Sequence, residues 1–235
     1  MEKTLRGVTL RKNEYRDNTA IVTLFTPDFG IISVTAYGIH STKKGVASAL
    51  QTFTYSEFTL SERNGKYTLK SAELIESFDR LSSSYDELCR AAKLSRAAMT
   101  IFSEPSDNMG DAFELFYTVL SFTAYSDSDP EDLYIAFLLH AFSLSGQCPA
   151  VTHCSVCERE LLSDRHMRFS PEDGGAVCSA GCSIKGVHVA PVFLEAMRRI
   201  LSLPVGELDK VKLPKELQKS LSVELDYYLR FWYLK

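Results

Sequence analysis

Two close pairs of cysteines constrain the fold of this chain more than any other feature. Two residues separate Cys154 from Cys157, three separate Cys178 from Cys182, and about twenty residues lie between the pairs. This spacing is typical of a structural zinc site, because each pair can place two thiolates on one tight turn. Four thiolates fill the tetrahedral shell and leave no open position for catalysis. The spacing therefore predicts a zinc ribbon within residues 151–190 that binds Zn²⁺ as a structural ion.

The first eighty residues predict a β-domain. Segments rich in β-branched and aromatic residues recur there, separated by turn signals at residues 27–30 and at Asn64-Gly65. Five strands are expected, over residues 5–12, 19–26, 31–37, 53–60 and 67–74. Five strands in so short a segment suit a small closed barrel, and the OB-fold is the five-stranded barrel that binds oligonucleotides.

Helical periodicity replaces the strand pattern after residue 81. Apolar residues at three- and four-residue spacing predict helices from the serines at 82–84 to Phe102, and over residues 111–125, 130–144, 192–203 and 215–235. The third of these is apolar on nearly every side, so it is expected to be the buried central helix. The predicted fold class is α+β: an OB-fold barrel (1–80), a helical domain in two parts (81–150 and 191–235) and an inserted zinc-binding element (151–190).

Composition places the chain in the cytoplasm and argues against an enzyme. No apolar run approaches the roughly 18 to 20 residues that span a bilayer, and the N-terminus lacks the apolar core of a signal peptide. Cytoplasmic thiols stay reduced, which favours a metal over disulfides.

Cys89 and Cys148 are interpreted as small core residues, and His153 and His166 as bystanders to the cysteines. No phosphate loop, serine elbow or zinc-protease motif occurs, so no catalytic residue is assigned.

Charge is distributed unevenly along the chain, whose net charge is −4. Residues 1–80 carry 11 basic and 9 acidic side chains, whereas residues 82–150 carry 3 and 10. The basic residues near the strands could contact phosphates, with aromatic rings available for base stacking. Charge alone favours an ordinary solvated surface, because acidic residues are interleaved with the basic ones. The candidate DNA-binding residues are Arg11, Arg16, Tyr37, His40, Lys43 and Lys44.

Four segments in this order resemble the bacterial DNA repair protein RecO family. They are residues 21–26 followed by Gly30, Tyr37-Gly38 with Lys43-Lys44, residues 50–53, and the first cysteine pair with residues 169–175 leading into Cys178. The resemblance spans essentially the whole chain. It implies an OB-fold, a helical domain and a zinc-binding element in a bacterial protein that acts in the cytoplasm, at the nucleoid. It also implies binding of single- and double-stranded DNA, strand annealing and, with RecR, help for RecA in displacing single-strand-binding protein.

The chain departs from the family pattern at positions that leave a second function open. Tyr37 stands where the family usually has a lysine, and His40-Ser41 where basic residues are usual. The alternative is a protein-interaction adaptor with an OB-fold and structural zinc but little or no DNA binding. In the cysteine segment, Glu158 replaces a usual glycine, and the second pair has three intervening residues in place of two.

Overall fold

Alternation of apolar and polar residues in the first eighty residues produces five strands that close into a barrel. They are β1 (Glu2–Tyr15), β2 (Thr19–Thr26), β3 (Gly30–Tyr37), β4 (Thr54–Arg63) and β5 (Lys66–Ser77). Their order is β1-β2-β3-β5-β4, and β4 returns to pair with β1. All neighbours are antiparallel except β3 and β5, which pair in parallel. The predicted OB-type barrel is confirmed. The computed structural model describes residues 2–15, 18–38, 44–161, 166–180 and 182–234.

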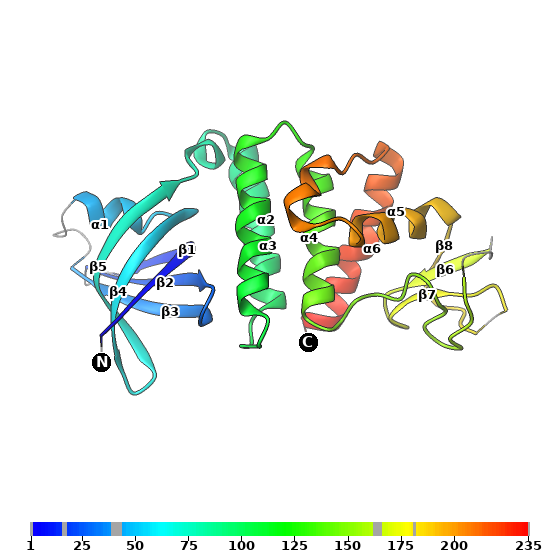
Figure 1. The fold of residues 1–235 in the computed structure, drawn as a ribbon, viewed down its shortest axis with the longest axis horizontal. Helices are drawn as coiled ribbons and strands as arrows, with labels where there is room; N and C mark the ends of the chain where they lie inside the picture. Colours follow the sequence, from blue (N-terminus) through cyan, green and yellow to red (C-terminus); the bar gives the residue numbers. More distant parts are fainter. Residues whose placement is uncertain (1, 16–17, 39–43, 162–165, 181, 235) are drawn as a thin grey trace. The chain divides into compact units, whose positions relative to one another are not determined.

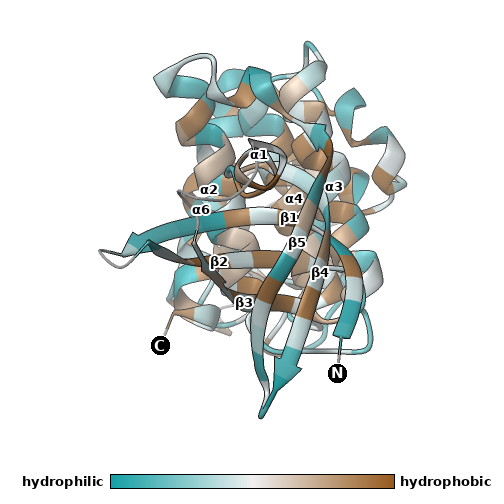
Figure 2. Cartoon of the chain, turned by 90° about the vertical axis from the view of Figure 1, so that its left-hand side faces the viewer, coloured by the Kyte–Doolittle hydropathy of each residue, from teal (hydrophilic) through white to brown (hydrophobic). Residues whose placement is uncertain are grey.

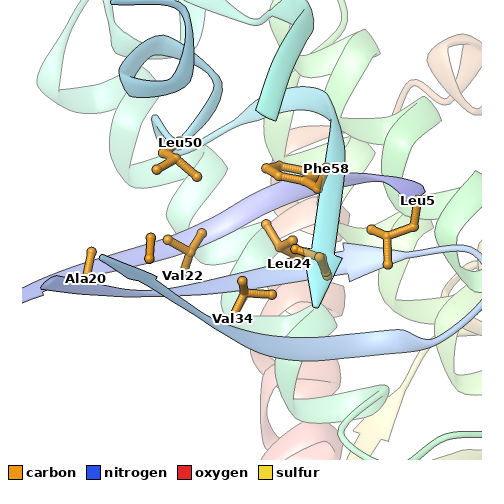
Figure 3. Close-up of a cluster of buried hydrophobic side chains, with 9 residues drawn as sticks. Leu5, Ala20, Val22, Leu24, Val34, Leu50 and Phe58 are labelled. Carbon is orange, nitrogen blue, oxygen red and sulfur yellow. The ribbon is translucent and has the colours of Figure 1, made fainter. Parts of the chain in front are cut away.

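The apolar residues of the strands fill the barrel from inside. Alternate positions on neighbouring strands point to the same side, so the inward set converges on one core. Figure 3 shows several of these side chains meeting between the strands. The cluster consists of Leu5, Ala20, Val22, Leu24, Val34, Ala36, Leu50, Phe58 and Leu60, each at most 4% exposed. More polar residues alternate with these apolar ones along the strands, as the changing colours of the strands in Figure 2 show.

Short connections in the barrel combine predicted and unpredicted features. Asn64 and Gly65 both have positive φ, as the expected two-residue hairpin requires. The six-residue helix α1 (Lys44–Ala49) was not predicted, because so short a segment shows little periodicity. Phe53 is buried with a φ of 63°, an unusual value for a bulky residue, and its N–H donates to the Thr9 carbonyl.

Two long helices belong to the same unit as the barrel. A 3-10 turn η1 (Asp79–Ser82) leads into α2 (Tyr85–Ile101), which is followed by α3 (Met109–Tyr125). The Ser84 hydroxyl caps α2 by accepting from the Glu87 N–H. Figure 1 shows the α2–α3 pair beside the barrel, where the Phe25 ring of β2 lies 5.5–5.9 Å from the rings of Phe102, Phe113 and Phe116.

The second unit is organised around a helix that is buried on nearly every side. This helix, α4 (Pro130–Leu144), has Pro130 in its first turn, and Asp129 caps it by accepting from the Glu131 N–H. Around it lie α5 (Pro191–Leu201), the 3-10 segment η2 (Val205–Lys210) and α6 (Lys215–Tyr233). Ten of the fifteen residues of α4 are buried, which confirms its predicted central position.

The cysteine segment contains a small second sheet. Its strands are β6 (Met167–Ser170), β7 (Gly175–Val177) and β8 (Val187–Val189), in the order β7-β6-β8. The two compact units comprise Met1–Tyr125 and Ser126–Lys235. The helical segment expected for residues 81–150 is thus divided between them. None of the helices among the described residues is long and apolar enough to cross a membrane.

One interpretation of the remaining cysteines is wrong. Cys89 and Cys148 are both exposed, although they were expected to be small core residues. Cys89 lies in the first turns of α2, where neighbouring residues are also exposed, and the buried face of the helix begins only at Ala91. Cys148 follows the end of α4, after the chain has turned at Gly146.

Candidate functional site

The first cysteine pair lies at the tip of a short hairpin formed by residues 152–161. Two backbone hydrogen bonds close this hairpin, Cys154 N–H to the Arg159 carbonyl (2.8 Å) and Leu161 N–H to the Thr152 carbonyl (2.9 Å). Inside it the Glu158 N–H donates to the Cys154 carbonyl, and Glu158 has a φ of 60°. A glycine adopts this left-handed conformation without strain, which explains why the family pattern has one at this position.

The second pair follows β7 and approaches the first pair directly. All four sulfurs lie within 4.8 Å of one another. The Cys157 and Cys178 sulfurs are 3.7 Å apart, and those of Cys178 and Cys182 are 3.3 Å apart. Sulfurs at about 2.3 Å from a tetrahedral zinc ion are separated by about 3.8 Å, so these distances fit the predicted ligand set. The three-residue spacing of the second pair therefore does not prevent the cluster from forming.

Burial and hydrogen bonding divide the four thiols into an inner and an outer pair. Cys154 and Cys178 are 1% and 2% exposed, whereas Cys157 is exposed and Cys182 half-buried. Burial alone would raise the pKa of Cys154, but backbone N–H groups of Cys157, Cys178 and Val156 outweigh it and hold the pKa at about 7. Hydrogen bonds with the neighbouring thiols of Cys178 and Cys157 raise the pKa of Cys182 to about 12.

These opposite shifts indicate what the cluster needs. Thiols this close together cannot all ionise without a cation, because each added negative charge raises the pKa of its neighbours. A divalent cation removes that conflict, and amide hydrogen bonds to sulfur are the outer-shell support usual in such sites. The Cys178 N–H supplies one of them to the Cys154 sulfur, at 3.4 Å. Cys154, Cys157, Cys178 and Cys182 could therefore hold one metal ion. His153 instead contacts the Thr152 hydroxyl.

The second candidate site is the outer face of strands β1, β2 and β3, which lie side by side in Figure 2. Tyr15 pairs with Thr19, and Thr19 pairs with Tyr37, so these three side chains form one row across the face. The tyrosines are 55% and 65% exposed. Two strand spacings separate them, about 10 Å.

Two further rows extend this face along the strands. Asn13, Ile21 and Thr35 form the next row, followed by Arg11, Thr23 and Ser33. Arg11 is exposed, and its Nε donates to the Asn13 side chain at 3.1 Å. The face therefore offers two aromatic rings, a guanidinium and several hydroxyl or amide groups. We call these nine residues the outer barrel face.

The described residues account for part of the predicted DNA-binding set. Arg11 and Tyr37 share the outer barrel face, as that prediction requires. Arg16, His40 and Lys43 lie outside the described residues, and Lys44 begins α1 with a side chain that is likewise not described. The assignment of these six residues to DNA stays a prediction.

Several residues of the outer barrel face were not among the predicted site residues. Tyr15, Asn13, Ser33 and Thr35 join the face through the strand register, which the alternation of outward positions could have indicated. Phe29, a further aromatic residue of the barrel, lies elsewhere. Its half-buried ring packs near Tyr67, with the Lys3 ammonium 4.8 Å from the ring centre.

Comparison with known proteins identifies the family. The family model described as "Recombination protein O N terminal" matches residues 1–78, and "Recombination protein O C terminal" matches residues 98–234. A protein of Alkaliphilus metalliredigens named DNA repair protein RecO is 27% identical over 225 residues, covering 95% of this chain and 90% of the relative. A protein of the same name from Symbiobacterium thermophilum is 28% identical, covering 95% and 89%.

The matches extend over nearly the whole chain and both of its units. A Listeria monocytogenes protein, also named DNA repair protein RecO, is 26% identical over 97% of this chain. The C-terminal family model alone covers more than half of the residues, including all four clustered cysteines. These relatives support a role in DNA repair and recombination. The chain therefore belongs to the Recombination protein O family.

Proposed function

We propose that this protein is a DNA-binding recombination mediator that binds single- and double-stranded DNA and anneals complementary strands. The observation that carries the proposal is the outer barrel face, where Tyr15 and Tyr37 flank Thr19 and Arg11 lies two rows away. Barrels that bind single strands combine stacking rings with cations along the backbone path. Two rings about 10 Å apart leave room for successive bases between them.

The roles of the individual residues follow from their chemistry. Arg11, Arg16, Lys43 and Lys44 neutralise phosphates, which supplies affinity without sequence information. Tyr37 and His40 stack on bases, and Tyr15 adds a second exposed ring. No bond is made or broken in these steps, so the proposed protein is not an enzyme. Annealing follows because neutralised phosphates let two strands approach each other.

Membership of the family extends the proposal to protein partners and to a cellular location. Acting with RecR, the protein helps to load RecA on single strands covered by single-strand-binding protein. We propose that it acts in the bacterial cytoplasm, at the nucleoid. We further propose that the metal is Zn²⁺ and that it is structural, because four thiolates complete its shell. The ion would fix the turns that carry the cysteines and hold residues 161–177 against the helices.

A second candidate function is a protein-interaction adaptor. The outer barrel face carries only one cation among its described side chains, Arg11, next to two exposed tyrosines. Tyrosine is also enriched at protein–protein interfaces, where its ring and hydroxyl group both contribute. An adaptor would use this face for a partner protein, with little affinity for DNA.

Fluorescence anisotropy with a labelled single-stranded oligonucleotide, at low and moderate salt, tests the DNA-binding proposal. We expect salt-sensitive binding that Tyr37→Ala weakens by roughly 1–3 kcal/mol, the contribution of one stacked base. Arg11→Glu, and the pair Lys43→Glu with Lys44→Glu, should weaken binding and flatten its salt dependence.

Lys70→Glu is the matched control for these charge reversals. Lys70 is an exposed lysine on β5, outside the outer barrel face, so its reversal should leave affinity nearly unchanged. Equal losses in the control and in the face variants would point to a general effect of net charge. Absence of binding at low salt would support the adaptor.

A further inference from the structure

The four clustered cysteines differ in their access to solvent, a difference that a purely structural metal site does not use. Cys154 and Cys178 are 1% and 2% exposed. Cys182 is half-buried, whereas Cys157, at the tip of the hairpin of residues 152–161, is exposed. A dissolved oxidant therefore reaches the Cys157 sulfur more easily than any other sulfur of the cluster.

A second sulfur lies close to this exposed one. The sulfurs of Cys157 and Cys178 are 3.7 Å apart, although the two residues are 21 positions apart in the sequence. A disulfide joins its sulfurs at about 2.05 Å, so a movement of less than about 2 Å would bring these two together. Redox-sensitive cysteines typically combine an accessible sulfur with a neighbour that resolves the first oxidation product. Cys157 and Cys178 match this arrangement.

The other cysteines match it less well. Cys89 and Cys148 are also exposed, but neither belongs to the group of sulfurs that lie within 4.8 Å of one another. The sulfurs of Cys178 and Cys182 are only 3.3 Å apart, yet one of these residues is buried and the other half-buried. Access thus favours a first attack at Cys157, and distance favours Cys178 as its partner.

We propose that Cys157 and Cys178 form a site of oxidative modification, at which hypochlorous acid replaces the metal link between the two cysteine turns by a disulfide. The inference rests on the proposed Zn²⁺ site and goes beyond its structural role. It requires neither DNA nor a protein partner.

The reaction balances in atoms and electrons. A thiol that coordinates a metal is held as the thiolate, which is the nucleophilic form. The Cys157 sulfur attacks the chlorine of hypochlorous acid, so an S–Cl bond forms and hydroxide leaves. The Cys178 sulfur then attacks the Cys157 sulfur, so the S–S bond forms and chloride leaves. The two sulfurs together lose two electrons, and chlorine gains them.

The product retains too few ligands for the metal. Cys154 and Cys182 remain as thiols, and a tetrahedral zinc site needs four donors. The new disulfide still joins the tip of the hairpin to the residue that follows β7. We therefore expect the hairpin and β7 to stay linked, while the turn that carries Cys182 loses its connection to both.

Oxidation of the full-length protein in small steps tests the proposal. The protein used carries Cys89→Ser with Cys148→Ser, because both residues are exposed and lie outside the cluster. Elemental analysis measures its zinc before any oxidant is added. A chromogenic chelator then follows zinc release, which should be complete at about one to two equivalents of hypochlorous acid.

Peptide mass spectrometry after alkylation of free thiols identifies the bond that forms. We expect Cys157 joined to Cys178, with Cys154 and Cys182 alkylated. Reduction by a dithiol followed by addition of zinc should restore the original metal content, because disulfide formation is reversible.

Two variants that keep four zinc ligands identify the reactive sulfur. Cys157→His removes the exposed thiol, and three cysteines with one histidine are also a structural zinc set. This variant should need at least about tenfold more oxidant for zinc release. Cys182→His is the matched control, because it removes the other outer thiol and leaves Cys157 and Cys178 in place. It should release zinc at the dose that the parent protein needs. The disulfide found in the parent protein does not depend on either variant.

Three results with the zinc-loaded protein would overturn this inference alone. They are retention of zinc at about ten equivalents of oxidant, release of zinc without a disulfide between Cys157 and Cys178, and equal sensitivity of Cys157→His and Cys182→His. A protein that contains no zinc before oxidation would instead overturn the metal proposal, and this inference with it.

Discussion

The barrel and the cysteine ribbon are both built from β-strands, yet different forces stabilise them. The barrel strands are 8 to 14 residues long and enclose nine buried side chains. The strands of the ribbon have 4, 3 and 3 residues. The Phe169 ring of its strand β6 packs against the Phe193 ring of α5. Small elements that cannot bury enough apolar surface depend on metals or disulfides. The barrel is therefore expected to depend on its core for stability, and the ribbon on a metal ion that its four cysteines could hold.

Removal of two of the metal ligands is expected to have the largest effect. Replacing Cys154→Ser together with Cys157→Ser should remove about one equivalent of zinc, because two ligands cannot hold the ion. Structural zinc contributes roughly 10–16 kcal/mol of apparent binding free energy, so the ribbon should unfold while the barrel remains folded. Elemental analysis measures the metal, and amide hydrogen exchange shows which residues lose protection.

Cys89→Ser with Cys148→Ser is the matched control for the loss of two thiols. Both residues are exposed and lie outside the cluster, so metal content should be unchanged. A metal-free protein whose ribbon keeps its exchange protection would disprove the dependence on an ion.

The second-largest expected effect comes from a substitution in the core of the barrel that leaves the four cysteines unchanged. Phe58→Ala removes a fully buried ring from the core and should lower the free energy of unfolding of the barrel by about 3–5 kcal/mol. The metal content should not change, since Phe58 lies outside the cysteine segment. Denaturant unfolding followed by circular dichroism provides the measurement.

Phe58→Leu keeps most of the buried volume and should lose less, about 1.5 kcal/mol or under. Simultaneous loss of zinc and barrel structure in Phe58→Ala would show that the two regions do not have independent sources of stability.

The smallest effect concerns one backbone position in the ribbon. Glu158→Gly relieves the left-handed conformation at a φ of 60° and should stabilise the metal-bound ribbon by about 0.5–1 kcal/mol. Slower zinc transfer to a chelator measures this gain. Glu160→Gly is the control, because Glu160 is not among the residues with positive φ and the added flexibility should speed the transfer. Similar behaviour of both variants would exclude relief of strain as the cause.

Much of the architecture could be predicted because it rests on local patterns. Strand alternation located all five barrel strands, and apolar periodicity located the long helices from α2 to α6. Cysteine spacing identified a cluster whose sulfurs do meet. In these cases the residues that specify an element lie next to one another in the sequence, or, for the cysteines, their chemistry leaves few alternatives.

Features that depend on tertiary packing could not be predicted. The exposure of Cys89 is decided by where α2 first meets its neighbours, which helical periodicity does not specify. The outer barrel face depends on a register between three strands, including a shift between Thr9 and Arg11. The buried Asp132 carboxylate accepts a hydrogen bond from the Leu213 N–H, about eighty residues further along the sequence, and no local pattern indicates this contact.

The ring cluster around Phe25 determines where this protein can be divided into fragments. Tyr117 and Tyr125 of α3 add hydrogen bonds to Glu76 and to the Ser77 carbonyl of β5. A fragment ending at residue 80 would lose the rings that cover Phe25 and would present that surface to other molecules, which favours aggregation. A fragment ending at Tyr125 keeps this cover intact. The folding boundary of the barrel thus lies nearly fifty residues beyond its last strand.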